Sequence, residues 1–305
     1  MCKMRNEYEI QIEVENNCYL DCLHCSSLLM RHEPSNPFIA EELMSFLKLF
    51  DVPMHVYFTG GEPLANPNLN RLIELVKRVA ANSKVGIFTC GILQNNTSVD
   101  RDLAMNLKMI GLDDCYISLY HCDAEKHDLI TNRKGSYCTT KQSIRNFIDV
   151  DIDVKVHLVI NRFNYQELDK TIFSILNLGV SQVRLLRLVK TGAAEMNWGK
   201  IGVPYKKQNE AIKDIISKLE RYSEAVTISG FPTEIACRPT QQAVKCQAGT
   251  HLLYVTNSKE IYPCACTKNN PSFLIGSICD LTKSVQYLKK QQEYQFNEDC
   301  LNPMC

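Results

Sequence analysis

Apolar residues recur along the chain with two different periods, and the two periods alternate. In residues 8–14 every second residue is apolar (Ile10, Ile12, Val14), which predicts a strand with one buried face. Residues 69–80 carry apolar side chains three and four positions apart, which predicts a helix. The same patterns predict further strands at 55–58, 85–88, 116–119, 153–160, 183–189 and 226–229, and further helices at 38–50, 101–110, 139–148, 168–176 and 212–219.

Six strand–helix units in succession favour a parallel sheet covered by helices, and right-handed crossovers would curl that sheet. We therefore predict an α/β fold, a partial (β/α)6 TIM-like barrel over residues 1–230, followed by a small cysteine-rich domain over residues 231–305. In barrels of this kind the chemistry gathers on the loops after the strands. Residues 190–204 are irregular and rich in glycine, and we expect them to cover part of the barrel mouth.

The charge balance excludes some partners. Lysine plus arginine and aspartate plus glutamate number 34 each, so no net field attracts nucleic acid or an anionic membrane. The first ten residues lack the apolar stretch of a secretion signal, and no apolar run is long enough to span a bilayer. We expect a cytoplasmic protein that binds neither nucleic acid nor membrane.

The chain has 15 cysteines, far more than packing requires in a reducing compartment. Three of them, Cys18, Cys22 and Cys25, lie on a predicted loop after the first strand at the spacing C-x3-C-x2-C. Three thiolates can hold three irons of a four-iron cluster and leave the fourth iron open. A zinc site completed by His24 or by a distant cysteine is the alternative.

A second motif, Thr59-Gly60-Gly61-Glu62-Pro63, follows the second predicted strand. With both motifs in this order, the sequence resembles the radical SAM superfamily. The resemblance implies that Cys18, Cys22 and Cys25 ligate a 4Fe-4S cluster whose open iron is chelated by S-adenosylmethionine (SAM). It assigns residues 60–63 to the amino group of SAM. His24 stands where relatives usually carry an aromatic residue beside the adenine, a departure that still permits stacking.

The resemblance implies further SAM contacts at the ends of later strands. Thr89 and Ser118 would bring a hydroxyl near SAM or substrate, although a hydroxyl that caps a strand end is also common. Arg133 and Asn161 would reach the SAM carboxylate, and Val189 would offer its backbone to the adenine; a solvated arginine is the ordinary alternative for Arg133. Residues 127–131 resemble a block found after the fourth strand in peptide-modifying and molybdopterin-type relatives.

Seven cysteines lie after residue 230. Their arrangement resembles the auxiliary-cluster domain called twitch, related to the larger two-cluster SPASM domain. This implies a second 4Fe-4S cluster on Cys246, Cys264, Cys300 and Cys305, with a hairpin over 252–262. Cys237, Cys266 and Cys279 compete for these roles, and we expect at least one of them to be free. Zinc on the same four thiolates is the alternative, because both metals accept tetrahedral thiolates.

The resemblance implies that the reduced cluster cleaves SAM to a 5′-deoxyadenosyl radical, which abstracts a hydrogen atom from substrate. It also implies a flavodoxin- or ferredoxin-type electron donor. Our first expectation for the substrate is a ribosomally made peptide that is crosslinked, epimerised, oxidised or given a thioether. Against it, few residues precede the first strand, too few for a leader-binding domain. The alternatives are a small-molecule dehydrogenase, a nucleotide cyclase, or a non-enzymatic iron–sulfur or zinc module.

Overall fold

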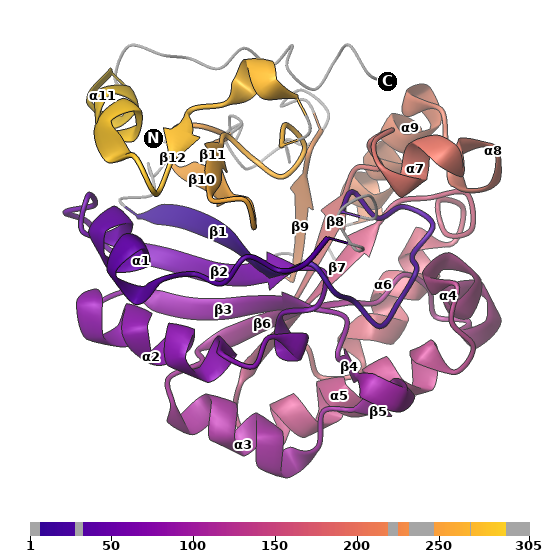
Figure 1. Ribbon diagram of the computed structural model, residues 1–305. Helices are drawn as coiled ribbons and strands as arrows, with labels where there is room; N and C mark the ends of the chain where they lie inside the picture. The colour runs from indigo at the N-terminus through magenta and orange to yellow at the C-terminus, as the bar shows by residue number, and fades with distance from the viewer. Residues whose placement is uncertain (1–6, 28–32, 219–224, 232–246, 269, 291–305) are drawn as a thin grey trace.

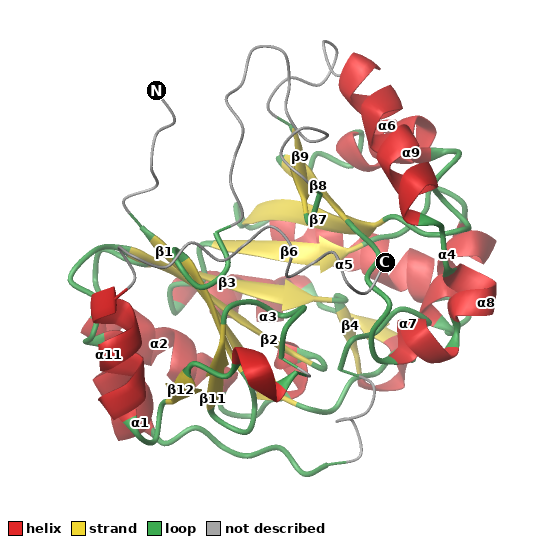
Figure 2. Cartoon of the chain, turned by 90° about the horizontal axis from the view of Figure 1, so that it is seen from above, coloured by secondary structure: helices red, strands yellow, loops and turns green. Residues whose placement is uncertain are grey.

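The computed structural model describes residues 7–27, 33–218, 225–231, 247–268 and 270–290. A curved, mostly parallel sheet runs through the molecule, with helices packed along its outer face (Figures 1 and 2). The sheet confirms the predicted α/β partial barrel. Its strands lie in the order β12-β11-β10-β1-β2-β3-β6-β7-β8-β9.

Seven parallel strands follow one another in chain order across the sheet. They are β1 (Tyr8–Glu15), β2 (Met54–Gly60), β3 (Lys84–Thr89), β6 (Asp114–Ser118), β7 (Asp153–Val159), β8 (Gln182–Leu186) and β9 (Val226–Ser229). The helices between them and after them are α1 (Ala40–Leu47), α2 (Leu69–Val79), α3 (Arg101–Met109), α4 (Ala124–Thr131), α5 (Ser136–Ile148), α6 (Leu168–Leu176), α7 (Ala193–Met196), α8 (Trp198–Ile201) and α9 (Tyr205–Lys218).

The C-terminal hairpin continues the same sheet on the other side of β1. β10 (Leu252–Val255) pairs parallel with β1, and β11 (Glu260–Tyr262) returns antiparallel to it. β12 (Gly276–Ser277) and α11 (Leu281–Lys290) follow. The predicted hairpin is thus present, and the sheet itself continues past residue 230. The division of the chain into two domains at that point stays a prediction.

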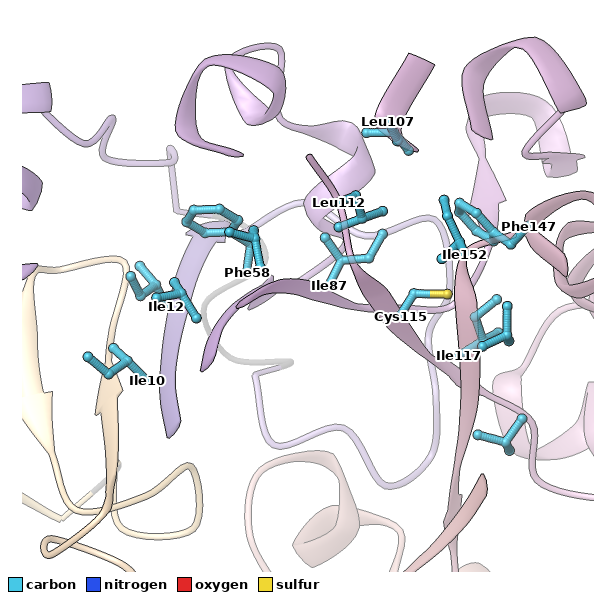
Figure 3. Close-up of a cluster of buried hydrophobic side chains, with 14 of the residues drawn as sticks. Ile10, Ile12, Phe58, Ile87, Leu107, Leu112, Cys115, Ile117, Phe147 and Ile152 are labelled. Carbon is cyan, nitrogen blue, oxygen red and sulfur yellow. The ribbon is translucent and has the colours of Figure 1, made fainter. Parts of the chain in front are cut away.

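The two faces of the sheet differ in burial because strand side chains alternate. Outward-facing residues such as Ile87, Ile117 and Phe58 are fully buried against the helices (Figure 3). On β7 the outward-facing Val154, Val156 and Leu158 are buried, whereas the inward-facing side chains between them remain partly exposed. On β2 and β6 the inward-facing Tyr57 and Tyr116 are buried as well, so the inner face of the sheet is only partly exposed.

Three features differ from the sequence-based prediction. α4 was not expected, because its buried residues (His127, Ile130, Thr131) form no apolar stripe. The hairpin of β4 (Ile92–Leu93) and β5 (Thr97–Ser98) is too short to show a period. The supposedly irregular residues 190–204 contain the short helices α7 and α8.

Three 3-10 turns complete the described chain: η2 (Pro63–Ala65), η3 (Gln94–Asn96) and η5 (Pro271–Phe273). Within the described part of the chain, every helix is too short or too polar to cross a bilayer.

Candidate active site at the carboxyl ends of the strands

The opening cysteine loop leaves β1 and is fixed by backbone hydrogen bonds to two distant helices. Leu23 N donates to Ile130 O of α4 (2.9 Å), and Ala193 N of α7 donates to Cys25 O (2.8 Å). At Gly192 a Cβ atom would lie 2.6 Å from Cys25 O, so glycine lets α7 approach the loop this closely. The second half of the loop is thus held in place by α4 and α7.

The surroundings of the three loop thiols are apolar. Cys18, Cys22 and Cys25 pack in a second core cluster with buried Leu20, Ile130, Leu188 and Ile201 among its members. Three thiols on one short loop, with Cys22 buried and Cys18 and Cys25 half-buried, fit an iron–sulfur cluster.

His24 packs edge-on against Tyr120, with ring centroids 4.5 Å apart. On the far side of Tyr120 the buried ring of His127 is stacked at 5.7 Å. His127 Nδ1 accepts a hydrogen bond from Tyr120 N (3.2 Å), so the neutral ring carries its proton on Nε2. Burial lowers the pKa of His127 to about 4. α4 was not expected as a helix, yet it supports the cysteine loop through the Ile130 carbonyl and, by way of Tyr120, through the ring of His127.

Gly60, the last residue of β2, and Gly61 after it let two chain segments approach each other closely. Gly60 has φ of +133°, and a Cβ there would lie 2.1 Å from Glu15 O. A Cβ on Gly61 would lie 2.1 Å from Asn17 O. Gly61 N donates to Glu15 O (2.6 Å), which ties this stretch to the start of the cysteine loop. Close packing therefore requires glycine at both positions, independently of the SAM contact that the resemblance implies.

Glu62 is completely buried, and four donors surround its carboxylate. Oε1 accepts from Thr89 Oγ1 (2.7 Å) and Leu64 N (3.0 Å), and Oε2 accepts from the amide and the thiol of Cys90 (2.8 Å each). Burial raises the pKa of Glu62, and the four hydrogen bonds oppose that rise. Pro63 follows in the first turn of η2 and is buried as well.

The remaining predicted SAM contacts lie at different depths. Ser118 ends β6 half-buried and hydrogen-bonds Tyr120. Asn161 is buried, with its side chain bonded within its own loop to Val159 O (2.9 Å) and Phe163 N (2.9 Å). Arg133 is exposed, and Val189 is half-buried with its carbonyl accepting from Thr191 N (3.0 Å). The structure thus brings Glu62 and Thr89 together, and it leaves Arg133 at the surface.

A buried ion pair connects the cysteine loop to the C-terminal hairpin. Lys268 Nζ contacts Glu13 on β1 and donates to Ser27 Oγ (2.6 Å), just after the loop. Tyr254 OH of β10 also donates to Glu13 (2.6 Å), and Asn257 N does so at 3.2 Å. Burial would raise the pKa of Glu13, but Lys268 and these hydrogen bonds outweigh it and leave that pKa lowered. Nothing in the sequence pattern pointed to this pair.

Of the predicted auxiliary ligands, Cys264 lies in the described chain. Its thiol is hydrogen-bonded to Cys266, which lowers the pKa of Cys264 to about 6. Cys279 is exposed, 3.6 Å from Glu42 Oε1 on α1. Cys237, Cys246, Cys300 and Cys305 lie outside the described residues, so the four-cysteine ligand set stays a prediction.

The inner face of the sheet forms the floor beneath these loops. His157 stacks on Tyr116 at 4.2 Å and meets the edge of Phe88 at 4.8 Å. Burial lowers the pKa of His157 well below its ordinary value. Deeper in the barrel, Lys155 pairs with Asp114 and Arg184 with Glu9. This floor is aromatic.

Comparison with known proteins agrees with this geometry. A family model described as the Radical SAM superfamily matches residues 12–175. A probable GTP 3′,8-cyclase of Saccharolobus islandicus is 27% identical over 220 residues, or 70% of this chain and 65% of that protein. Molybdenum cofactor biosynthesis protein 1 of Dictyostelium discoideum is 33% identical over 161 residues, or 51% of this chain and 24% of that protein. The chain thus spans less than two thirds of the length of these relatives.

Two solved structures share the fold. Streptococcus suis SuiB bound to S-adenosylmethionine has a TM-score of 0.71 at 14% identity, covering 97% of this chain and 70% of that one. Native anSMEcpe with bound AdoMet has a TM-score of 0.67 at 16% identity, covering 94% of this chain and 84% of that one. At these identities the likeness concerns the fold.

Proposed function

Because the chain belongs to the radical SAM superfamily, we propose that Cys18, Cys22 and Cys25 hold the 4Fe-4S cluster of a radical SAM enzyme. When bound, the cluster and SAM supply a 5′-deoxyadenosyl radical that removes a hydrogen atom from substrate. The observation that carries this assignment is the pre-formed cysteine loop. Its backbone is anchored to α4 and α7, and its thiols lie next to the buried Glu62 arrangement.

The chain's own residues have three tasks at this site. The apolar cluster around the loop excludes water, so a reactive intermediate is protected from side reactions. Three donors from Thr89 and Cys90 fix Glu62 against the end of β3. The hydrogen bonds of Gly61 N to Glu15 O and of Glu62 N to Asn17 O hold this stretch against the end of β1 and the start of the cysteine loop. Further SAM contacts are proposed for His24, Gly60, Gly61, Glu62, Pro63, Thr89, Ser118, Arg133, Asn161 and Val189.

For the substrate, we propose a small molecule bound above the aromatic floor, with a purine nucleotide as the first candidate. Sequence similarity supports this choice, because the relatives named above include probable GTP 3′,8-cyclases. It revises the expectation from sequence alone, in which a nucleotide cyclase was the alternative and a peptide the first choice. A purine ring can stack on aromatic side chains such as those of the floor.

A peptide is the second candidate, and the charge of the barrel interior favours it. Lys155, Arg184 and Lys268 each contact an acidic partner within the described residues. A triphosphate binds best to cations that are free to pair with it. A neutral peptide side chain makes no such demand. The likeness in fold to SuiB, which has been crystallised with its precursor peptide, extends over the C-terminal hairpin as well.

The substrate classes can be separated with one assay. Reconstituted enzyme is given SAM and reductant, and 5′-deoxyadenosine is measured with GTP, with guanosine, or with neither. Nucleotide chemistry predicts a faster rate with GTP and a new purine product. If neither addition changes the rate or yields a product, the nucleotide proposal fails and peptides become the candidates. The triple Cys18/Cys22/Cys25→Ala variant is the control for background cleavage.

We also propose the auxiliary 4Fe-4S cluster on Cys246, Cys264, Cys300 and Cys305, and a flavodoxin- or ferredoxin-type electron donor. In support, the pKa of Cys264 is lowered to about 6, and a thiol that ionises readily is suited to metal ligation. Cys266 beside it is a competing ligand.

A further inference from the structure

The end of the opening cysteine loop is held from two sides. On one side, Ala193 N of α7 donates to Cys25 O at 2.8 Å. On the other side, Ser27, two residues after Cys25, is buried and accepts a hydrogen bond from Lys268 Nζ at 2.6 Å. Lys268 follows the hairpin of β10 and β11, 241 positions after Ser27. The last of the three loop cysteines is therefore held between α7 and a segment from the far end of the chain.

The contact belongs to a closed arrangement of buried side chains. Lys268 pairs with Glu13 on β1, and Ser27 Oγ, which accepts from Lys268, donates to the same carboxylate (3.2 Å). Tyr254 OH of β10 donates to this carboxylate as well (2.6 Å). All four side chains are buried, so the loss of any one of them leaves a buried polar group without its partner.

We propose that Lys268 is a positioning residue for SAM cleavage. Through Ser27 and Glu13 it holds the end of the cysteine loop, and with it Cys25, in the geometry that the reaction needs. This rests on the proposed function of the loop. A metal site depends on the partners that hold its ligands in place, and the loss of one such partner costs roughly 10- to 100-fold in metal affinity or activity.

Glu13 connects this arrangement to the second sequence motif. In the sheet it stands opposite Thr59, the first residue of the Thr59-Gly60-Gly61-Glu62-Pro63 motif. Asn257, in the turn of the C-terminal hairpin, donates to the Glu13 carboxylate through its backbone (3.2 Å) and to Glu13 O through its side chain (3.3 Å). The hairpin thus fixes both the backbone and the side chain of Glu13, and Lys268 extends that contact to the loop.

Lys259 provides an internal comparison, because it ties the same hairpin to the barrel at a different place. It is buried like Lys268, and its Nζ donates to Glu42 on α1 at 2.6 Å. This ion pair involves neither Ser27 nor Glu13. If Lys268 only stabilised the fold, variants of the two lysines should behave alike. If Lys268 positions the loop, only its variant should change the loop.

The test compares Lys268→Met, Ser27→Ala and Lys259→Met with the wild type in two measurements on the 305-residue chain. In the metal-free protein, hydrogen–deuterium exchange of the peptide that covers residues 18–27 is followed by mass spectrometry. After anaerobic reconstitution, the iron content and the rate of 5′-deoxyadenosine formation are measured. The exchange reports on the loop without a cluster, so it can be interpreted independently of the proposed function.

We expect residues 18–27 to exchange about tenfold faster in Lys268→Met and Ser27→Ala, the scale of one lost hydrogen bond to a charged group. Both reconstituted variants should keep their iron and form deoxyadenosine about tenfold more slowly. Lys259→Met should match the wild type in both measurements, although its melting temperature falls. Ser27→Ala keeps the ion pair of Lys268 with Glu13, so it decides the question if Lys268→Met does not fold.

Three results would overturn the proposal. Wild-type exchange of residues 18–27 in both variants would show that Lys268 does not hold the loop. Equal changes in Lys259→Met would show that any loosening of the hairpin has the same effect. Faster exchange with an unchanged rate of deoxyadenosine formation would show that the reaction does not depend on this contact. A wild-type protein that assembles no four-iron cluster would refute the proposed function instead, and the exchange data would still show whether Lys268 holds the loop.

Discussion

The opening cysteine loop and the described C-terminal cysteines Cys264 and Cys266 belong to two regions that are built differently. In the opening loop three thiols lie within eight residues, and backbone bonds to α4 and α7 hold them. In the C-terminal segment the cysteines are spread from residue 237 to residue 305. Cys25 of the first region and Cys266 of the second both lie close enough to Tyr254 to influence its pKa.

The difference shows how two kinds of site are stabilised. A ligand set on one loop needs little more than the loop's own anchors. A ligand set drawn from distant segments needs contacts that fix those segments, and the buried pair of Glu13 and Lys268 is such a contact. We therefore expect substitutions in the opening loop to abolish SAM cleavage. Substitutions at the C-terminal contacts should first lower the free energy of unfolding.

The largest effect is expected from the triple Cys18/Cys22/Cys25→Ala variant. The wild-type protein should bind about eight irons per chain after anaerobic reconstitution, as two four-iron clusters, and the variant about half as many. Iron and labile sulfide are measured together. Zinc without sulfide in the wild type would exclude both clusters.

Loss of the auxiliary site should come next. Cys264→Ala should lose about four irons and melt at a lower temperature, because metal-binding energy is also folding energy. It should retain the SAM-dependent change in the EPR signal of the opening cluster. Cys138→Ala, at an exposed thiol on α5, is the matched control and should keep all iron. Full iron in Cys264→Ala would show that Cys264 is not a ligand.

The Lys268→Met variant tests the contact between the two regions. Removing one partner of a buried ion pair leaves a buried charge without compensation, so unfolding free energy should fall by about 3 kcal/mol. Lys218→Met breaks an exposed pair with Asp214 on α9 and should cost less than about 0.5 kcal/mol. Urea titration measures both. Equal losses of unfolding free energy in the two variants would show that Lys268 does not stabilise the fold more than an exposed lysine does.

The same pair predicts a dependence on pH. The pKa of Glu13 is lowered in the folded state, so its contribution is present above the ordinary carboxyl pKa and is lost as the pH falls below it. The difference in unfolding free energy between the wild type and Lys268→Met should therefore become smaller in acid. Stability curves at pH 7 and in progressively more acidic buffers show whether the two proteins converge.

The smallest effect concerns His127, beneath the opening loop. Its pKa of about 4 in the folded state lies below that of a free histidine. As the pH falls, the unfolded chain is therefore protonated at a higher pH than the folded chain. Stability from this residue is complete above about pH 6.5 and declines toward pH 4. In a plot of unfolding free energy against pH, His127→Gln should lack this decline in acid. Above about pH 7 its plot should have nearly the same slope as that of the wild type. An NMR titration in which His127 protonates near pH 6.5 would contradict the burial argument.

Much of the barrel was predictable because its signals are local. The period of two marks β1 and β7, and the helical period marks α2 and α6 within a residue or so of their bounds. α4 escaped detection, since it buries a histidine and a threonine instead of an apolar stripe. The parallel pairing of β10 with β1 joins residues some 240 positions apart in the chain, and no local pattern encodes it.

The candidate site divides in the same way. The cysteine loop was found from its spacing, whereas the roles of Glu62 and Thr89 were implied by the family resemblance. In the structure Thr89 donates to Glu62. The contacts of Cys90 with Glu62 had no signal in the sequence, because they depend on how the end of β3 meets the segment after β2. Such contacts become visible only once the chain is folded.

The most direct test of the central assignment is the product of SAM cleavage without substrate. Reconstituted protein, SAM and a strong reductant are incubated anaerobically, and the nucleoside products are separated by chromatography. We expect 5′-deoxyadenosine and methionine from the wild type and none from the triple Cys18/Cys22/Cys25→Ala variant. S-adenosylhomocysteine in place of deoxyadenosine, or equal deoxyadenosine from both proteins, would contradict it.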